Sequence, residues 1–141
     1  MTLYLDASVI VPLVVTENAS EITRAWIAKQ RDSFYTGHLA VGEAGSAISR
    51  RRRMNLLTDD HGDRALAALD AWLRSSVSIV DHDPEDIETA AKWVRRPLPK
   101  LLMPDAIHLA TCRRLHFRMA TGDTGLTEVA NLLGIDWVMP T

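Results

Sequence analysis

The chain has 141 residues, 47% of them hydrophobic and 24% charged, with a formal net charge of −2 at pH 7. This balance excludes a disordered or low-complexity chain, and the length suits one domain, which we place at 1–141. No run of 18 apolar residues is present, so we expect no membrane span. The N-terminus lacks the features of a secretory signal, and the single cysteine, Cys112, excludes an internal disulfide, so we expect a cytoplasmic protein.

Short apolar stretches of strand length alternate with helical stretches along the chain. In chain order, the patterns predict a strand at 3–5, helices at 7–15 and 19–30, a strand at 34–36, helices at 38–56 and 59–75, a strand at 77–80, helices at 84–96 and 104–114, a strand at 117–121, a helix at 124–133 and a strand at 135–138. Ser20 is a candidate N-cap, and Gly134 is a candidate helix end. The alternation predicts a parallel sheet that is covered on both faces.

Four acids interrupt stretches that are otherwise apolar or rich in small residues: Asp6, Glu43, Asp105 and Asp123. A charge in an apolar setting is unfavourable unless it is hydrogen-bonded, paired or bound to a metal. Taken alone, Asp6 and Asp123 could be helix caps, and Asp105 could be an acid favoured by the dipole of its helix. Most other acids lie in polar runs such as TDDHGD and DHDPED, which we interpret as solvated faces and helix caps.

A parallel sheet would bring these acids together. Ligands of open α/β sheets bind beyond the carboxyl ends of the strands, and Asp6 and Asp123 both follow predicted strands. Carboxylates that share a pocket raise one another's pKa unless a cation compensates their charge. Oxygen ligands without cysteines, and without histidines at ligand spacing, suit Mg²⁺ or Mn²⁺, which can activate water and neutralise charge on a phosphodiester.

Four segments resemble, in order, the motifs of the PIN-domain family, and they look most like those of its bacterial VapC-type toxin ribonucleases. These segments are LYLDASVIVPLV, HLAVGEAGSAISRR, LPKLLMPDAIHLATCRRL and MATGDTGL, over about residues 2 to 135. The resemblance implies a three-layer α/β/α sandwich with a central, mainly parallel sheet. It places the family's acids on Asp6, Glu43, Asp105 and Asp123, and two supporting hydroxyl groups on Ser8 and Thr121.

The resemblance also implies an activity and partners. The family binds Mg²⁺ or Mn²⁺ with these acids and cleaves RNA, and its VapC-type members are expected to form homodimers that a cognate VapB-like antitoxin inhibits. All four acids are present in this sequence. The resemblance therefore predicts a metal-dependent endoribonuclease, the toxin of a type II toxin–antitoxin module, in which metal-activated water hydrolyses the phosphodiester bond.

Arginines cluster near the predicted site. If four acids bind a cation, 14 acids remain against 16 lysines and arginines, so the net charge does not exclude a nucleic acid partner. Arginine pairs well with phosphate. The candidate RNA-binding residues are Arg50, Arg51, Arg52, Arg53, Arg113 and Arg114. For the run of four, a solvated helix end or a surface for an acidic partner is an equal alternative.

Two other functions fit parts of the pattern. A phosphatase of the haloacid-dehalogenase type would use Asp6 as its nucleophile, but that family requires a second aspartate where Ser8 stands. A catalytically silent PIN-like module could bind RNA or protein through its arginines, although unpaired acids would weaken RNA binding. His108, one helical turn after Asp105, could position substrate or could be a partly buried polar residue beside the site.

Overall fold

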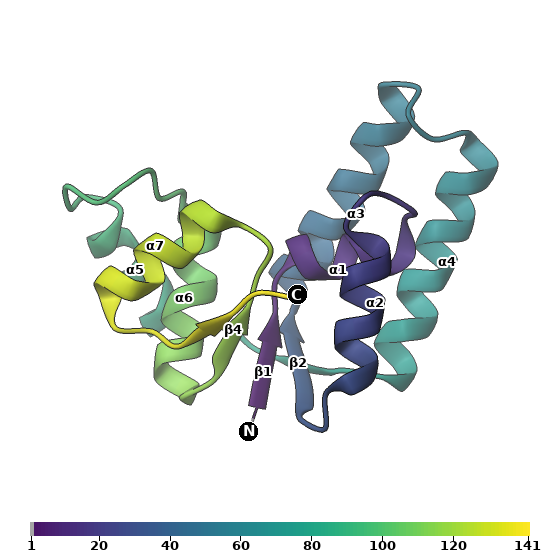
Figure 1. Ribbon diagram of the computed structural model, residues 1–141. Helices are drawn as coiled ribbons and strands as arrows, with labels where there is room; N and C mark the ends of the chain where they lie inside the picture. The colour runs from purple at the N-terminus through teal and green to yellow at the C-terminus, as the bar shows by residue number, and fades with distance from the viewer. Residues whose placement is uncertain (1) are drawn as a thin grey trace.

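The computed structural model describes residues 2–141, which form five strands and seven helices (Figure 1). Their bounds in chain order are β1 (Thr2–Leu5), α1 (Ala7–Val14), α2 (Ser20–Lys29), β2 (Ser33–Gly37), α3 (His38–Arg53), α4 (Asp59–Ser75), β3 (Ser78–Val80), α5 (Pro84–Trp93), α6 (Met103–Leu115), β4 (Arg118–Ala120), α7 (Thr124–Leu133) and β5 (Trp137–Val138). Every predicted element is present in the predicted order. None of the helices within residues 2–141 is long and apolar enough to cross a membrane.

The five strands form one parallel sheet in the order β3-β2-β1-β4-β5. β1 lies at the centre, where Tyr4 pairs with Tyr35 of β2 on one side and with Met119 of β4 on the other. The chain adds β2 and β3 on one side of β1 and then returns to add β4 and β5 on the other side. The direction of winding therefore reverses between β1 and β4, which makes this the switch point of the sheet.

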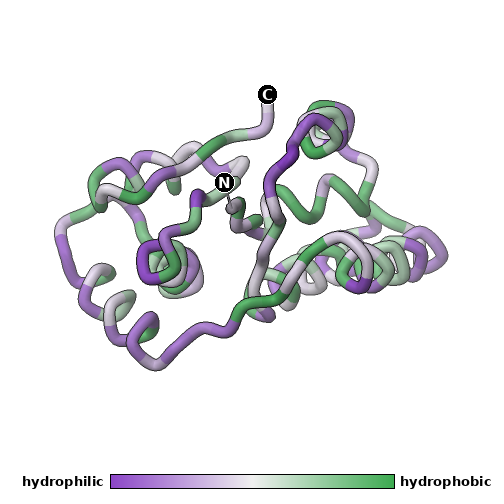
Figure 2. The backbone as a smooth tube through the Cα atoms, turned by 90° about the horizontal axis from the view of Figure 1, so that it is seen from below, coloured by the Kyte–Doolittle hydropathy of each residue, from purple (hydrophilic) through white to green (hydrophobic). Residues whose placement is uncertain are grey.

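Helices cover both faces of the sheet and complete three layers, as predicted. Helices α1–α4 lie on one side and α5–α7 on the other (Figure 1). The view from below shows the same two groups, with hydrophilic and hydrophobic residues alternating along the helices (Figure 2). The alternation of side chains along β1 serves both layers, because Leu3 and Leu5 belong to the core under α1–α4 while Tyr4 belongs to the core under α5–α7.

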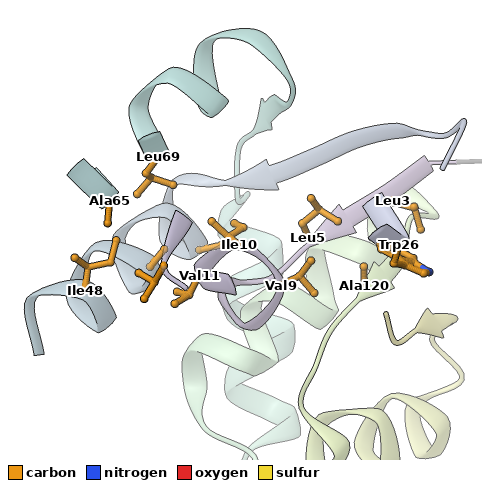
Figure 3. Packing of buried hydrophobic residues seen from close by; sticks show 13 residues of the cluster. Leu3, Leu5, Val9, Ile10, Val11, Trp26, Ile48, Ala65, Leu69 and Ala120 are labelled. Atoms are coloured by element: carbon orange, nitrogen blue, oxygen red, sulfur yellow. The ribbon is translucent and has the colours of Figure 1, made fainter. Parts of the chain in front are cut away.

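Helix α1 is the most enclosed helix of the first core. Its side chains Val9, Ile10 and Val11 are at most 5% exposed, and they pack with residues from β1, α2, α3 and α4 (Figure 3). Complete burial of one such side chain contributes about 1.5–3 kcal/mol. This packing fixes the N-terminus of α1, and with it Asp6, against the end of β1.

Several helix ends differ from the predictions, by up to three residues. The helix predicted over 38–56 stops at Arg53, because Asn55 adopts a left-handed conformation with φ 57°. The helix predicted over 84–96 ends at Trp93. Ser20 is the first residue of α2 rather than its N-cap, because its hydroxyl donates to the carbonyl of Val15 at 2.7 Å and ties the end of α1 to the start of α2. Gly134 ends α7 with φ 70°, as predicted.

Candidate active site

The carboxyl ends of β1 and β4 lie side by side at the switch point of the sheet. Leu5 pairs with Ala120, and the backbone N–H of Asp6 donates to the carbonyl of Ala120 at 3.2 Å. Asp6 follows β1 directly, and Asp123 follows β4 after two residues. The structure thus brings the first and fourth predicted acids to the same edge of the sheet, where open α/β sheets bind their ligands.

Asp6 is a buried carboxylate, 5% exposed, that accepts hydrogen bonds from uncharged groups. Its Oδ1 accepts from the hydroxyl of Ser8 at 2.5 Å and from the backbone N–H groups of Ser8 and Val9, so it caps α1. Its Oδ2 accepts from the hydroxyl of Thr121 at 2.5 Å. Burial raises the pKa of Asp6, and the hydrogen bonds from Ser8 and Thr121 oppose that rise. Asp6 therefore caps α1 and also lies at the switch point of the sheet.

The two predicted hydroxyl groups link the first acid to the fourth. The Oγ of Ser8 and the Oγ1 of Thr121 lie 3.2 Å apart, and the backbone N–H of Gly122 donates to Ser8 Oγ at 2.8 Å. The backbone N–H of Asp123 donates to Thr121 Oγ1 at 3.1 Å. The carboxylate of Asp123 caps α7 by accepting two N–H groups of its first turn, at 2.9 and 3.2 Å. Ser8 and Thr121 therefore lie between two of the acids, where the resemblance places them.

Glu43 comes from α3, the helix that follows β2, and its side chain is 33% exposed. Its Oε1 lies 2.5 Å from Nε2 of His108, a side chain of α6 that is only 1% exposed. Asp105 stands one turn earlier in α6, behind Pro104 in the first turn. The second and third predicted acids therefore approach the site from opposite layers of the sandwich.

The electrostatics of Asp105 connect all four acids. Its pKa is raised to about 6, first by burial and then by the negative charge of Glu43, with smaller contributions in the same direction from Asp6 and Asp123. Nearby His108 opposes the rise. Charges influence a pKa in this way only at short range. The structure therefore gathers the four acids into one electrostatic neighbourhood, as the strand-end argument predicts.

The four acids suit a hard divalent cation by their chemistry. They supply only carboxylate oxygens, the ligands that Mg²⁺ and Mn²⁺ prefer, and the other three acids add to the rise that burial causes in the pKa of Asp105. Within residues 2–141, no three acids, histidines or cysteines stand in the arrangement of a preformed metal site. Asp6 instead bonds to Ser8 and Thr121, and Glu43 bonds to His108.

The four arginines at the end of α3 divide into two pairs. Arg50 and Arg53 line an open groove along α3 that Glu43 also lines. Arg51 forms an ion pair with Glu17 at 2.8 Å. The side chain of Arg52 packs on Gly62 of α4, and a Cβ atom added to Gly62 would lie only 2.4 Å from it. Arg52 also forms ion pairs with Asp59 and Asp63 of α4, at 3.2 and 3.1 Å. Arg51 and Arg52 therefore form ion pairs within the fold, while Arg50 and Arg53 line the groove beside Glu43.

The other two candidate arginines are also engaged. The guanidinium of Arg113 lies 5.6 Å from the ring centroid of Trp93, a cation–π distance. Arg114 forms a two-pronged ion pair with Asp86, at 2.9 and 2.8 Å. The interpretation of the DHDPED run as solvated faces and helix caps holds in part for Asp86. It accepts from the backbone N–H of Asp83 in the cap of α5, but it is 1% exposed rather than solvated and also accepts from Thr111. A pattern of polar residues cannot show this burial, because the partners come from α6.

Comparison with known proteins shows the family of this chain. A sequence profile of the PIN domain matches residues 3–132. Ribonuclease VapC46 of Mycobacterium tuberculosis is 32% identical over 148 aligned positions, which cover 99% of this chain and 98% of that protein.

Solved structures share the fold at low sequence identity. The Mycobacterium tuberculosis toxin VapC20, described as cleaving the sarcin-ricin loop, superposes with a TM-score of 0.75 at 17% identity, over 90% of this chain and 94% of that one. VapBC2 of Rickettsia felis, bound to a DNA fragment from its promoter, gives a TM-score of 0.71 at 10% identity, over 99% and 98% of the two chains. Because the profile spans most of the chain and the ribonuclease relative spans nearly all of it, the chain belongs to the PIN-domain family.

Proposed function

We propose that this protein is a metal-dependent endoribonuclease, the toxin of a type II toxin–antitoxin module of the VapBC kind, and that 1–141 is a single PIN domain. The observation that carries the proposal is the convergence of four acids at the switch point. Glu43, Asp6 and Asp123 all contribute to the raised pKa of Asp105. The relative named as a ribonuclease and the VapC-type structural neighbours support the same activity.

In this proposal Asp6 and Asp105 are the main ligands of Mg²⁺ or Mn²⁺, and Glu43 and Asp123 complete the site directly or through water. The bound cation would supply an activated water molecule and neutralise charge on the scissile phosphate. The hydroxyl groups of Ser8 and Thr121 keep Asp6 oriented by donating to its two oxygens, and their own oxygens can accept a hydrogen bond from water.

The role of the protein groups is to hold and orient the reactants. Glu43 has one oxygen bonded to His108 and a second that is available to orient the attacking water in line with the leaving oxygen. Direct attack of water needs no covalent intermediate, so the products carry 5′-phosphate and 3′-hydroxyl ends. Products with 2′,3′-cyclic phosphate ends would exclude this mechanism.

RNA would reach the acids along the groove of α3. Arg50 and Arg53 line this groove together with Glu43, so their guanidinium groups lie where the phosphates of a bound strand would pass. Arg51, Arg52 and Arg114 have ion pairs within the fold, and RNA would have to compete with those contacts. We therefore place the primary RNA contact at Arg50 and Arg53.

The proposal includes partners and a compartment. Solved VapBC and FitAB complexes share this fold, among them FitAcB of Neisseria gonorrhoeae and a toxin–antitoxin complex of Klebsiella pneumoniae. A small VapB-like antitoxin that covers the acids, a homodimer and a cytoplasmic location follow from the same proposal.

RNA cleavage by purified, antitoxin-free protein tests the activity. We expect cleavage in Mn²⁺ or Mg²⁺ that is lost with a chelator and lost in Asp105→Asn, whose amide cannot supply the anionic ligand. Arg52→Ala is the matched control, because it changes a charged residue of α3 that pairs within the fold and should retain the activity. Equal cleavage by wild type and Asp105→Asn would contradict the proposal, as would hydrolysis of a phosphomonoester without cleavage of RNA.

A further inference from the structure

His108 occupies an unusual place beside the acids. The side chain is 1% exposed, and each ring nitrogen has one partner. Nε2 lies 2.5 Å from Oε1 of Glu43, and Nδ1 lies 2.6 Å from the hydroxyl of Tyr4. Tyr4 is itself fully buried in β1, directly beside the switch point. A buried line of three polar groups thus runs from the centre of the sheet to Glu43.

The partners determine where the protons lie. The carboxylate of Glu43 can only accept a hydrogen bond, so Nε2 of His108 must carry a proton and donate it. When the ring is neutral, Nδ1 accepts from the hydroxyl of Tyr4; when the ring is protonated, Nδ1 donates to the oxygen of that hydroxyl. Burial raises the pKa of the Tyr4 phenol, which keeps that hydroxyl protonated. In both states His108 donates to Glu43, and Tyr4 holds the ring at the opposite nitrogen.

A second histidine packs against the same ring. The ring of His82 meets that of His108 edge-on, with the centroids 5.7 Å apart. Thr111 donates to Asp86 at 3.0 Å, so its oxygen accepts from Nδ1 of His82 at 2.6 Å. Nε2 of His82 has no hydrogen-bond partner among residues 2–141, and burial lowers the pKa of His82, which keeps this ring neutral. His108 is therefore held by two hydrogen bonds and by an uncharged aromatic wall.

We propose that His108, oriented by Tyr4, is a positioning residue that holds the carboxylate of Glu43 in the orientation that binds the metal. The proposal rests on the metal-dependent activity proposed above. His108 forms a hydrogen bond with Oε1 of Glu43. Within the described part of the chain Oε2 has no hydrogen bond, so it is available to bind a cation or a water molecule of that cation. Carboxylates that bind metals are commonly held by such a hydrogen bond, and its removal costs about 10–100-fold in metal affinity or activity.

The test is Mn²⁺ binding to metal-free, antitoxin-free protein, measured by calorimetry. His108→Met removes the donor at similar volume, and we expect the affinity for Mn²⁺ to fall about 10–100-fold. His108→Gln places an amide N–H near the former Nε2 and should restore most of that loss. Ser20→Ala is the control, because it removes a buried hydroxyl group of α2 that bonds to the backbone of Val15 and Glu17 and not to His108 or Glu43, and it should bind Mn²⁺ as wild type does.

The kinetics of RNA cleavage give a second readout. Glu43 acts at the reacting phosphate in this account, so His108→Met should lower kcat and leave the KM for RNA nearly unchanged. Tyr4→Phe keeps His108 in place but removes its hydrogen-bond partner at Nδ1, and we expect a smaller loss in the same direction. This variant also keeps the test decisive if His108→Met does not fold.

The outcomes separate the two proposals. Wild-type affinity in both folded His108→Met and Tyr4→Phe would overturn the positioning role and leave the metal site intact. A loss in His108→Gln as large as that in His108→Met would also overturn it, because the donated hydrogen bond would not be what matters. Failure of the wild-type protein to bind Mn²⁺ would overturn both the metal site and this role.

Discussion

Asp105 is a partly buried carboxyl group with three other acids nearby, and burial is the main cause of its pKa of about 6. The folded protein holds this proton more tightly than the unfolded chain, whose carboxyl group has a pKa near 3.8. The contribution of Asp105 to stability is therefore complete below about pH 3.8 and is lost as the pH rises through about 6.

Asp105→Asn removes this ionisation without removing the side chain. In the metal-free state we expect the variant to be more stable than wild type above pH 6, by roughly 3–6 °C in Tm, the shift that 1–2 kcal/mol would produce in a domain of this size. Near pH 4 the two proteins should melt together. Thermal melts of both proteins in chelator from pH 4 to 8 measure this, and a difference that is independent of pH would show that Asp105 titrates normally.

Thr121 donates one of the two short hydrogen bonds to the buried carboxylate of Asp6. In Thr121→Val, Oδ2 of Asp6 loses its donor, so the pKa of Asp6 should rise further and stability at pH 7 should fall by about 1–3 kcal/mol. Urea unfolding of metal-free protein measures the change. Thr124→Val is the control, because Thr124 is exposed at the start of α7, and an equal effect in both variants would show that Thr121 has no special role.

The four acids could be predicted from the sequence because a charged residue inside an apolar stretch is unfavourable unless it has a partner, and such a residue can be recognised from its immediate neighbours in the chain. Asp6, Glu43, Asp105 and Asp123 all stand out in this way, and the structure brings them together. The bond between His108 and Glu43 could not be predicted, because its two residues are 65 positions apart and belong to different layers. The burial of Asp86 was missed for the same reason, since Arg114 and Thr111 reach it from another helix.

The four arginines at the end of helix α3 lie on different faces of the helix. Arg50 and Arg53 line the groove beside Glu43, while Arg51 and Arg52 bind acids of other elements. The sequence shows four arginines in a row but cannot assign them to faces, because the positions of the α1–α2 connection and of α4 around the helix decide which arginines find partners. The predicted helix end also failed here, since Asn55 adopts a left-handed conformation three residues before the N-cap Thr58.

RNA binding separates these two pairs of arginines. In an Asp105→Asn background, which prevents cleavage, Arg50→Ala with Arg53→Ala should weaken RNA binding. The logarithm of the binding constant falls linearly with the logarithm of the salt concentration, and the double substitution should make this fall less steep by about 0.7 for each lost contact to single-stranded RNA. Fluorescence anisotropy across a salt series measures both quantities.

Arg52→Ala in the same background is the control for this measurement. It should keep the salt slope and reduce thermal stability instead, because it removes two contacts between α3 and α4. An unchanged slope in the Arg50/Arg53 double variant would place the RNA path elsewhere.

The whole molecule places the acids through its strand order. β1 at the centre, with β2 on one side and β4 on the other, lets α3 and α6 deliver Glu43 and Asp105 to the point where Asp6 and Asp123 emerge. The alternation of strands and helices predicts the layers, because each element must bury one face. It does not specify the order β3-β2-β1-β4-β5, which depends on crossover connections that the hydrophobic pattern does not record.

The most direct test of the central claim is to locate Mn²⁺ in crystals of antitoxin-free protein by anomalous scattering, in wild type and in Asp105→Asn. We predict a peak bonded to oxygens of Asp6 and Asp105 at about 2.0–2.6 Å, the range of hard cations, with Glu43 and Asp123 bound directly or through water, and no such peak in the variant. Mn²⁺ found only at another place, or absent from these acids under conditions in which the protein cleaves RNA, would contradict the account.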